Sequence, residues 1–166
     1  MFSATFMILL DSKRIDRSLK RMTYQVLEEV RDSPVHITGL NERGFRVAER
    51  VTKILENIST HPFTLSRINA DNDSDFNFNK PVQPNETLLL VDDVIFSGNT
   101  MYRAMEKIGE LSRFKKVLVM VLIDRGHRTL PVQAEIVGMH VPTKLNEHIE
   151  LVIRDNKPEK VTLTKQ

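Results

Sequence analysis

Short apolar runs alternate along the chain with stretches in which apolar residues recur every three or four positions. A short apolar run bounded by turn residues is typical of a buried strand, whereas the longer spacing is typical of an amphipathic helix. The runs that predict strands are residues 6–10, 35–40, 63–68, 87–91, 116–123, 136–141 and 149–153, with a short last one at 161–163. Strands that alternate with helices predict an α/β domain with a mainly parallel sheet.

Three stretches have the helical spacing. The first begins at Asp11 or Ser12, because either side chain can cap the first turn. One face of this helix is apolar and consists of Ile15, Leu19, Met22, Val26 and Val30. The second helix covers residues 45–58 after a turn at 41–44, and the third covers residues 100–113. The order strand–helix–strand–helix–strand over the first part of the chain favours a parallel sheet with right-handed crossovers.

The composition predicts one globular domain over residues 1–166. Apolar residues make up 40% and charged residues 28%, and the net charge of +2 is too small to indicate nucleic acid by itself. The absence of cysteine excludes disulfides and thiolate metal sites and fits a reducing cytoplasm. Residues 1–10 are apolar but short and lack a basic segment, so they predict a strand and no signal peptide or membrane span. Residues 155–166 are expected to form a polar tail.

Residues 69–86 are polar and long for a connection, which predicts a mobile acidic loop. Asp71, Asp73 and Asp75 alternate as in a calcium loop. Phe76 stands where an EF-hand loop needs glycine, however, and a valine replaces its last glutamate. A metal site is therefore not expected in this loop.

Five basic residues fall on one arc of the first helix, away from its apolar face. They are Lys13, Arg14, Arg17, Lys20 and Arg21. Two interpretations remain open, namely a solvated helix face and a surface that binds a polyanion such as RNA.

The stretch that says most about function is residues 88–100, where an apolar run ends in two carboxylates, Asp92 and Asp93. The carboxyl end of a strand is where α/β sheets bind ligands. The turn that follows offers hydroxyl groups, a close backbone approach and a helix N-terminus, all suited to a phosphate, through Ser97, Gly98, Asn99 and Thr100. The acid pair could bind a cis-diol, hold Mg²⁺ or form an exposed acidic turn. The phosphate features beside it favour a sugar phosphate with Mg²⁺.

Two further loops follow predicted strands and are expected at the same edge of the sheet. In the first, residues 41–44, Arg43 and Gly44 could present a guanidinium and backbone amides to a diphosphate. The second, residues 124–126, is a compact charged loop. Without a binding role, the first loop would be a tight turn with a surface arginine, and the second would be a surface ion pair.

Residues 91–100 resemble the phosphoribosyl-diphosphate signature of the type I phosphoribosyltransferases. The resemblance implies that family's fold, a mainly parallel central sheet flanked by helices, with a small hood region. It also implies that Asp92 and Asp93 bind the ribose hydroxyls and Mg²⁺ and that residues 97–100 bind the 5-phosphate. The family's pyrophosphate loop corresponds to Asn41, Glu42, Arg43 and Gly44.

Residues 122–132 and 38–44 resemble the pyrimidine-operon attenuation regulators, which double as uracil phosphoribosyltransferases. This likeness implies a base site at Ile123, Asp124, Arg125 and Gly126. It also implies an RNA surface that includes His127 and Arg128, to which Arg17 and Arg21 of the basic arc are added.

The resemblance implies a transferase that uses 5-phosphoribosyl diphosphate and Mg²⁺, with Asp92, Asp93 and Arg43 in the catalytic machinery. Phe96 stands where the purine enzymes of the family carry a carboxylate, and it cannot accept a proton, so a pyrimidine, with uracil giving UMP, is favoured. The acidic loop favours the alternative, a nucleotide-sensing attenuation regulator that binds a leader RNA with little or no turnover. A cytoplasmic homodimer or higher homo-oligomer is expected.

Overall fold

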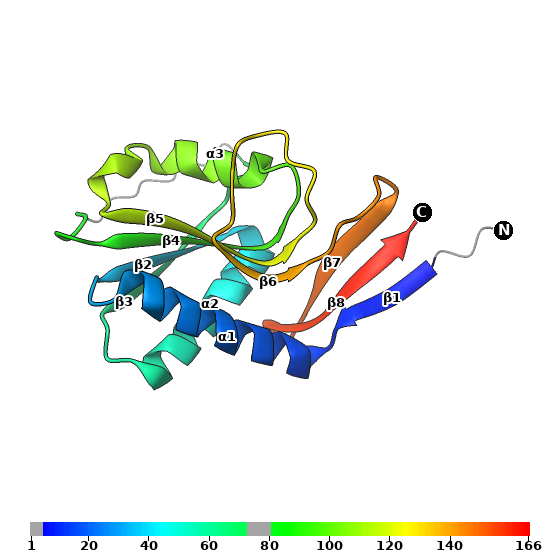
Figure 1. Ribbon diagram of the computed structural model, residues 1–166, viewed down its shortest axis with the longest axis horizontal. Coiled ribbons are helices and arrows are strands. Elements are labelled where there is room, and N and C mark those ends of the chain that lie inside the picture. Colours follow the sequence, from blue (N-terminus) through cyan, green and yellow to red (C-terminus); the bar gives the residue numbers. More distant parts are fainter. Residues whose placement is uncertain (1–4, 73–80) are drawn as a thin grey trace.

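The computed structural model describes residues 5–72 and 81–166. Two sheets lie side by side, a larger parallel one and a smaller antiparallel one (Figure 1). In the parallel sheet the strand order is β3 (Phe63–Ile68), β2 (Val35–Leu40), β4 (Thr87–Ile95), β5 (Lys116–Asp124) and β6 (Ile136–His140). All four neighbouring pairs are parallel, which confirms the predicted α/β class.

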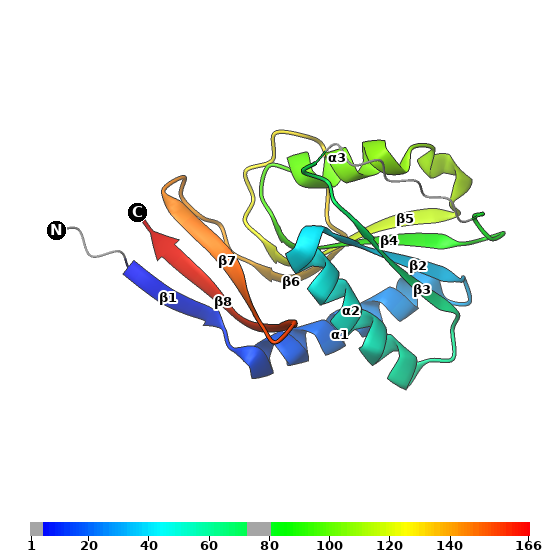
Figure 2. The same cartoon turned by 180° about the vertical axis from the view of Figure 1, so that it is seen from behind.

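Helices cover both faces of the parallel sheet. α1 (Ser12–Val30) and α2 (Asn41–Ile58) pack on one face, and α3 (Asn99–Ile108) lies on the other, as the two opposite views show (Figures 1 and 2). The predicted apolar face of α1 is buried at all five positions. Asp11 is the cap, since its Oδ1 accepts a hydrogen bond of 2.8 Å from the amide of Arg14. None of the helices in the described ranges combines the length and apolar character that a membrane span requires.

The smaller sheet corrects the placement of the first strand. β1 (Thr5–Leu10) lies antiparallel to β8 (Lys157–Lys165), which in turn pairs with β7 (Glu147–Arg154). The first strand is therefore not in the parallel sheet that the strand–helix order favoured. Residues 5–8 are exposed, whereas central parallel strands are buried on both faces.

The C-terminal segment is also different from the prediction. Instead of a polar tail with a strand at 161–163, residues 157–165 form the central strand of the small sheet. The turn before it is made by Asp155 and Asn156, both with left-handed backbones (φ 51° and 61°). Two such residues form the kind of tight hairpin turn that matches the twist of the strands it joins. Polar residues thus mark a turn and an alternating strand here.

The boundaries of β4 and α3 differ from the prediction. β4 continues to Ile95, so Asp92 and Asp93 belong to the strand and the predicted turn at 92–99 shrinks to its last residues. α3 begins one residue earlier than predicted and ends at Ile108, five residues before the predicted end. Gly109 follows it with a positive φ of 83°, a backbone conformation that glycine adopts readily. A short 3₁₀ helix, η1 (Leu111–Arg113), fills the rest.

One apolar cluster joins the two sheets. It contains α1 and α2 side chains such as Leu19 and Val51 together with Leu151 of β7 and Val161 of β8. A second cluster lies between α3 and the other face of the parallel sheet, around Leu90 and Met101. Because the first cluster spans both sheets, the position of the small sheet is set by the main core.

Two glycines allow α2 to approach the parallel sheet closely. A Cβ on Gly39 would overlap the backbone of Phe45 in α2, with the Phe45 amide nitrogen 2.9 Å away. A Cβ on Gly44 would lie 2.9 Å from both the Val91 carbonyl oxygen and Asp92 Oδ1. Both distances are shorter than a carbon can tolerate, so α2 would have to move away from β2 and β4.

We expect Gly39→Ala to lower the free energy of unfolding by about 2 kcal/mol or more, as overpacking of a close backbone contact does. Urea denaturation followed by circular dichroism measures this. Thr60→Ala, at an exposed position beyond α2, is the control and should change stability by less than about 0.5 kcal/mol. Equal stability of the two variants would contradict the close-packing account.

Candidate functional site

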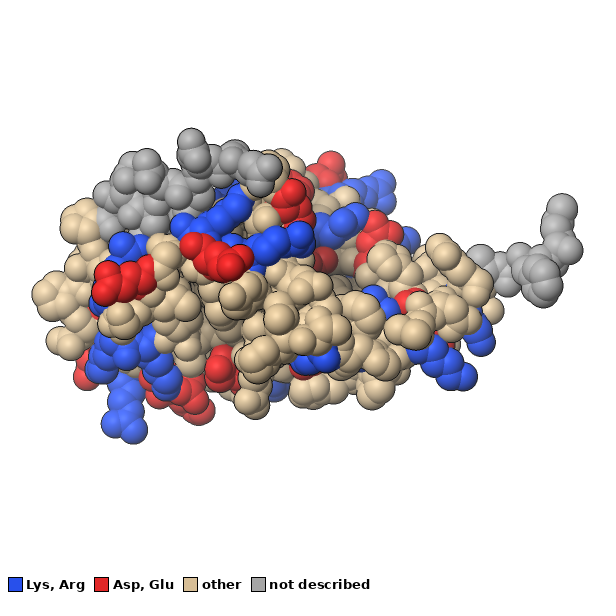
Figure 3. Space-filling model, turned by 90° about the horizontal axis from the view of Figure 1, so that it is seen from above, with Lys and Arg blue, Asp and Glu red and all other residues tan. Residues whose placement is uncertain are grey.

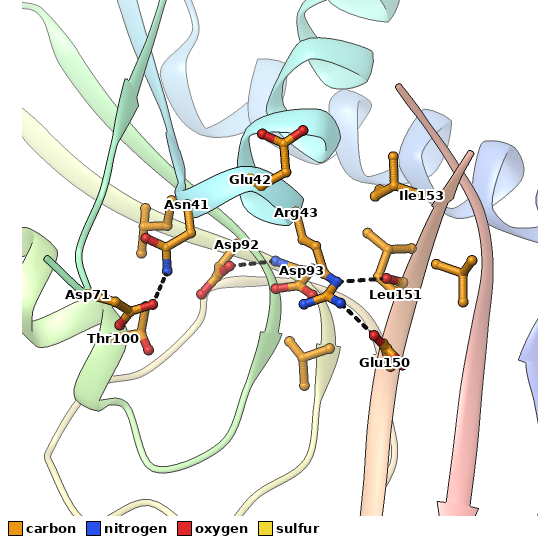
Figure 4. A pocket seen from close by; sticks show the side chains of 13 residues that line it. Asn41, Glu42, Arg43, Asp71, Asp92, Asp93, Thr100, Glu150, Leu151 and Ile153 are labelled. Atoms are coloured by element: carbon orange, nitrogen blue, oxygen red, sulfur yellow. Dashed lines mark hydrogen bonds and ion pairs between the residues drawn. The ribbon is translucent and has the colours of Figure 1, made fainter. Parts of the chain in front are cut away.

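A cavity of about 740 Å³ lies between the carboxyl end of β4 and strand β7. Its walls come from the start of α2, the end of β4, the start of α3 and the small sheet (Figure 4). Five of the described side chains that line it are carboxylates, namely Glu42, Asp71, Asp92, Asp93 and Glu150. Among the same residues Arg43 is the one cation. The lining is therefore strongly electronegative, and an anionic ligand needs Arg43, backbone amides or a metal ion.

The acid pair forms the floor of the cavity. Asp92 is buried, and its Oδ1 accepts a hydrogen bond of 2.9 Å from the backbone amide of Asp93. Burial, followed by repulsion from the Asp93 carboxylate, raises the pKa of Asp92 well above the ordinary aspartate value. Asp93 is half-buried. The ligand-free native state thus holds one carboxylate under conditions that disfavour its charge, and carboxyl groups of this kind are common at functional sites.

The phosphate turn is next to the acid pair. Asp92 and Thr100 line both the cavity and an adjoining hollow of about 190 Å³, whose other walls include Ser97, Gly98 and Asn99. Gly98 has a left-handed φ of 90° and is the residue before α3. The structure therefore places the predicted diol and phosphate residues around two adjoining spaces.

Both helices that begin at this site lack a side-chain cap. Leu40 precedes α2 and Gly98 precedes α3, and neither provides a capping hydrogen bond to its helix. Asp11 provides one to α1. A helix N-terminus without a cap leaves amide donors that can bind an anion. The uncapped starts of α2 and α3 suit two separate phosphate groups.

The predicted turn at 41–44 is the first turn of α2. Asn41 has a left-handed backbone (φ 55°) and bridges two segments. Its Oδ1 accepts from the amide of Ala70 at 2.8 Å, and its Nδ2 donates to Asp71 at 2.7 Å. Asp71 also accepts from Arg103 of α3 at 2.8 Å. Asp71 is thereby held at the cavity wall, while Asp73, Asp75, Phe76 and Lys80 lie outside the described residues.

Arg43 points across the cavity to the small sheet (Figure 4). Its Nη2 lies 2.5 Å from Glu150 Oε1, and its Nε donates to the Leu151 carbonyl oxygen at 3.0 Å. Glu42 turns the other way, toward Arg46 and Arg67 at 2.8 and 2.7 Å. The hydrogen bond from Arg46, aided by Arg67 and opposed by slight burial, lowers the pKa of Glu42. The predicted diphosphate arginine therefore has a carboxylate partner.

The predicted base loop is close to the phosphate turn but does not line the main cavity. The Arg125 amide donates to the Ile95 carbonyl oxygen at 3.0 Å, and its guanidinium carbon lies 4.3 Å from the centre of the Phe96 ring. Asp124 pairs with Arg128 at 2.8 Å. Burial acts to raise the pKa of Asp124, but Arg128 and the Gly126 amide outweigh it and lower that pKa. The Ile123 side chain is fully buried, so only its main chain could contact a base.

The predicted RNA residues differ in how their side chains are engaged. Arg128 donates to the carbonyl oxygens of Phe96 and Val132 as well as to Asp124, which fixes its loop. His127 contacts the Thr143 carbonyl oxygen. Arg21 donates to two carbonyls of β6. Arg17 is exposed on α1. On the face that Figure 3 presents, basic and acidic side chains are interspersed, so this face is not a basic surface. RNA binding therefore stays a prediction.

Comparisons with known proteins agree with this geometry. Residues 7–152 match the sequence profile of the phosphoribosyl transferase domain. The chain belongs to the phosphoribosyltransferase family. It is 34% identical over 162 residues to the "Bifunctional protein PyrR" of Latilactobacillus sakei, covering 89% of this chain and 90% of that protein. It is 32% identical over 172 residues to the PyrR protein of Thermoanaerobacter pseudethanolicus, covering 95% and 97%.

Solved phosphoribosyltransferases share the fold. The hypoxanthine phosphoribosyltransferase of Trypanosoma cruzi superposes with a TM-score of 0.72 at 15% identity over 95% of both chains. That of Staphylococcus aureus gives a TM-score of 0.65 at 14% identity, over 85% of this chain and 79% of the other. At these identities the likeness concerns the fold alone. It confirms the type I phosphoribosyltransferase fold expected from the sequence.

The β7 residues that line the cavity of this phosphoribosyltransferase had no functional signal in the sequence. Glu150 and Leu151 come from a stretch that predicts only an edge strand. Nothing in the local pattern distinguishes Glu150 from a solvent-facing residue of an alternating strand. Its role depends on how the hairpin of β7 and β8 packs beside β4. Asp71 was visible as one of three acidic residues, but its bond to Asn41 was not.

We expect Asp92→Asn to raise the free energy of unfolding of the ligand-free protein by about 1 kcal/mol at neutral pH, because it removes a buried charge and keeps an oxygen for the Asp93 amide. Since the pKa of Asp92 is raised, its stabilising form is the protonated one, and that contribution is lost as the pH rises above 3.8 and through the native value. The advantage of the variant should therefore grow with pH.

Thermal unfolding between pH 4 and pH 8 tests this expectation. Asp124→Asn is the control with the opposite sign, because the lowered pKa of Asp124 means that its ionised form stabilises the native state. That variant should lose stability at neutral pH and approach the parent as the pH falls. If Asp92→Asn is less stable than the parent protein at pH 7, burial does not disfavour the Asp92 charge.

Proposed function

We propose that this protein binds 5-phosphoribosyl diphosphate with Mg²⁺ and transfers the phosphoribosyl group to a pyrimidine base, with uracil giving UMP. The observation that carries the proposal is the juxtaposition of the acid pair with two uncapped helix starts. Asp92 and Asp93 lie between the start of α3, suited to a 5-phosphate, and the start of α2, suited to a diphosphate. In phosphoribosyl diphosphate, the ribose diol lies between the 5-phosphate at one end and the diphosphate at the other.

The residues at the carboxyl end of β4 fit Mg²⁺ that arrives with its substrate. Mg²⁺ is commonly bound through one or two carboxylates, with water and substrate phosphates completing its shell. In the parts of the chain that the structure describes, no three or more acidic or histidine side chains are placed close enough together to hold a metal ion by themselves. Asp92 and Asp93 would therefore hold a hydrated ion directly or through water. Bound there, the ion would neutralise diphosphate charge and favour the ionised form of Asp92.

The rest of the chemistry is assigned to positioning and charge. Residues 97–100 and the amides of α3 would hold the 5-phosphate, and Arg43 with the amides of α2 would hold the leaving diphosphate. The C1–O bond to the diphosphate breaks with its electron pair going to the diphosphate, a bond forms from C1 to the N1 atom of uracil, and the N1 proton passes to solvent. Asp93, exposed to the cavity, would bind the ribose hydroxyls while C1 gains positive charge.

The choice of a pyrimidine rests on Phe96 and its surroundings. The Phe96 ring lies against the Arg125 guanidinium and its centre is 5.5 Å from that of the His127 ring, and Phe96 lines the hollow of the phosphate turn. A phenyl group cannot take a proton from a purine ring. Main-chain groups of residues 124–126 would read the base. A cytoplasmic location and a homodimer or higher homo-oligomer form part of the same proposal.

The direct test is nucleotide formation by the purified protein with Mg²⁺, 5-phosphoribosyl diphosphate and, separately, uracil, cytosine, hypoxanthine and guanine. We expect UMP from uracil alone, measured by chromatography. Asp93→Asn should weaken donor binding by on the order of tenfold, as the loss of a hydrogen bond to a charged group does, with an unchanged melting curve. Donor affinity that stays the same in this variant would contradict the ribose assignment.

A second candidate is a nucleotide-sensing attenuation regulator with little turnover. It is favoured by the carboxylate-rich lining of the cavity and by the pairing of Arg43 with Glu150, both of which oppose a diphosphate. A sensor needs only a mononucleotide site, for which the phosphate turn is sufficient. If UMP binds and no base supports turnover, this candidate replaces the transferase.

Binding to the leader RNA of a pyrimidine operon, titrated across a salt series, tests the regulatory role. Arg17→Ala should weaken binding and reduce the slope of log affinity against log salt by about 1, as loss of one phosphate contact does. Lys53→Ala removes the same charge from the exposed surface of α2 and should change neither quantity. A weak, sequence-independent response of the parent protein would remove the RNA hypothesis.

A further inference from the structure

Glu150 is an acidic side chain at the place where a diphosphate would need a cation. It projects from β7 into the cavity and engages Arg43, the one cation among the described lining residues. We propose that Glu150 is a built-in competitor for Arg43, which makes the site favour a nucleoside monophosphate over a ligand with a diphosphate. This inference rests on the proposed function, because it assigns Arg43 to the diphosphate end of the donor.

The contact is positioned by buried neighbours. Ile149 and Leu151, on either side of Glu150, are 4% and 0% exposed and belong to the main core. Arg43 Nε is bound to the Leu151 carbonyl oxygen at 3.0 Å, next to the Glu150 backbone. The β7 backbone thus accepts a hydrogen bond from the guanidinium and anchors the residue whose carboxylate pairs with it. A diphosphate that binds Arg43 therefore has to displace Glu150, whose backbone stays next to the guanidinium.

The pair is nevertheless weak enough to be displaced. The Arg43 and Glu150 side chains are 50% and 46% exposed, and ion pairs at such exposure contribute little and are screened by salt. A diphosphate carrying Mg²⁺ can therefore compete, at a reduced affinity. A 5′-phosphate at residues 97–100 would not meet Glu150, which is absent from the lining of that hollow.

An alternative role for Glu150 is to hold Arg43 in the orientation that a diphosphate needs. Glu150→Gln separates the two roles, since the amide oxygen can still accept the Arg43 hydrogen bond while the negative charge is lost. A competitor role predicts tighter diphosphate binding in this variant. An orienting role predicts equal or weaker binding.

The experiment is calorimetric titration of inorganic pyrophosphate and, separately, UMP into the full chain at saturating Mg²⁺ and low salt. Glu150→Gln should bind pyrophosphate about fivefold more tightly, the factor that corresponds to an exposed ion pair at the upper end of its usual strength. The gain should shrink toward about twofold at high salt. UMP affinity should change by less than about twofold, which also shows that the variant is folded.

Glu159→Gln is the matched control. It removes the same charge from the same sheet and breaks an exposed pair with Arg154 at 3.3 Å, outside the cavity. It should leave pyrophosphate affinity unchanged. In an Arg43→Gln background the gain from Glu150→Gln should fall below about twofold, because the competition acts through Arg43.

Four results overturn the competitor role, namely no gain in Glu150→Gln, an equal gain for UMP, an equal gain in Glu159→Gln, and a full gain without Arg43. If UMP binds and one of these occurs, only the competitor role is lost. If neither pyrophosphate nor UMP binds to the parent or to Glu150→Gln, the proposed function is wrong and the competitor role is lost with it.

Discussion

The site depends on how closely α2 approaches the end of β4. Gly44 lies against the Val91 carbonyl and Asp92, leaving no room for even one added carbon. This contact brings the amides at the start of α2 close to the acid pair. It also places Arg43 where its side chain reaches across the cavity to β7. Gly39 likewise allows β2 to lie close to the same helix at Phe45. If an added methyl group pushed α2 outward, the amides at the start of α2 would move away from the acid pair. A diphosphate and the ribose attached to it must contact both at once.

Sequence patterns are sufficient for the five strands that form the parallel sheet, for α1 and for placing the acid pair at the end of one of those strands. The α1 face from Ile15 to Val30 is buried as its spacing predicts, because burial of an amphipathic face dominates helix placement. The phosphate turn is recognisable because Gly98 and its hydroxyl-bearing neighbours follow a buried strand. These features are local, so they can be predicted without knowledge of the tertiary fold.

The small sheet could not be predicted in the same way. β1 and β8 are separated by most of the chain, and their antiparallel pairing depends on contacts that no local pattern encodes. The polar residues after Asp155 resemble a tail because alternating strands exposed on one face are rich in polar residues. Glu150 shares this problem, since its partner Arg43 lies more than a hundred residues earlier.

The shared core of the two sheets has a consequence for how this chain can change over evolutionary time. Leu151 packs in the same cluster as Leu19 and Val51, so the wall that carries Glu150 and the scaffold that carries Asp92 form one mechanical unit. An insertion in the β7–β8 hairpin or a volume change in α1 alters the width of the cavity. New ligand preferences in this chain are therefore more accessible through single substitutions of residues that line the cavity than through rebuilding of the small sheet.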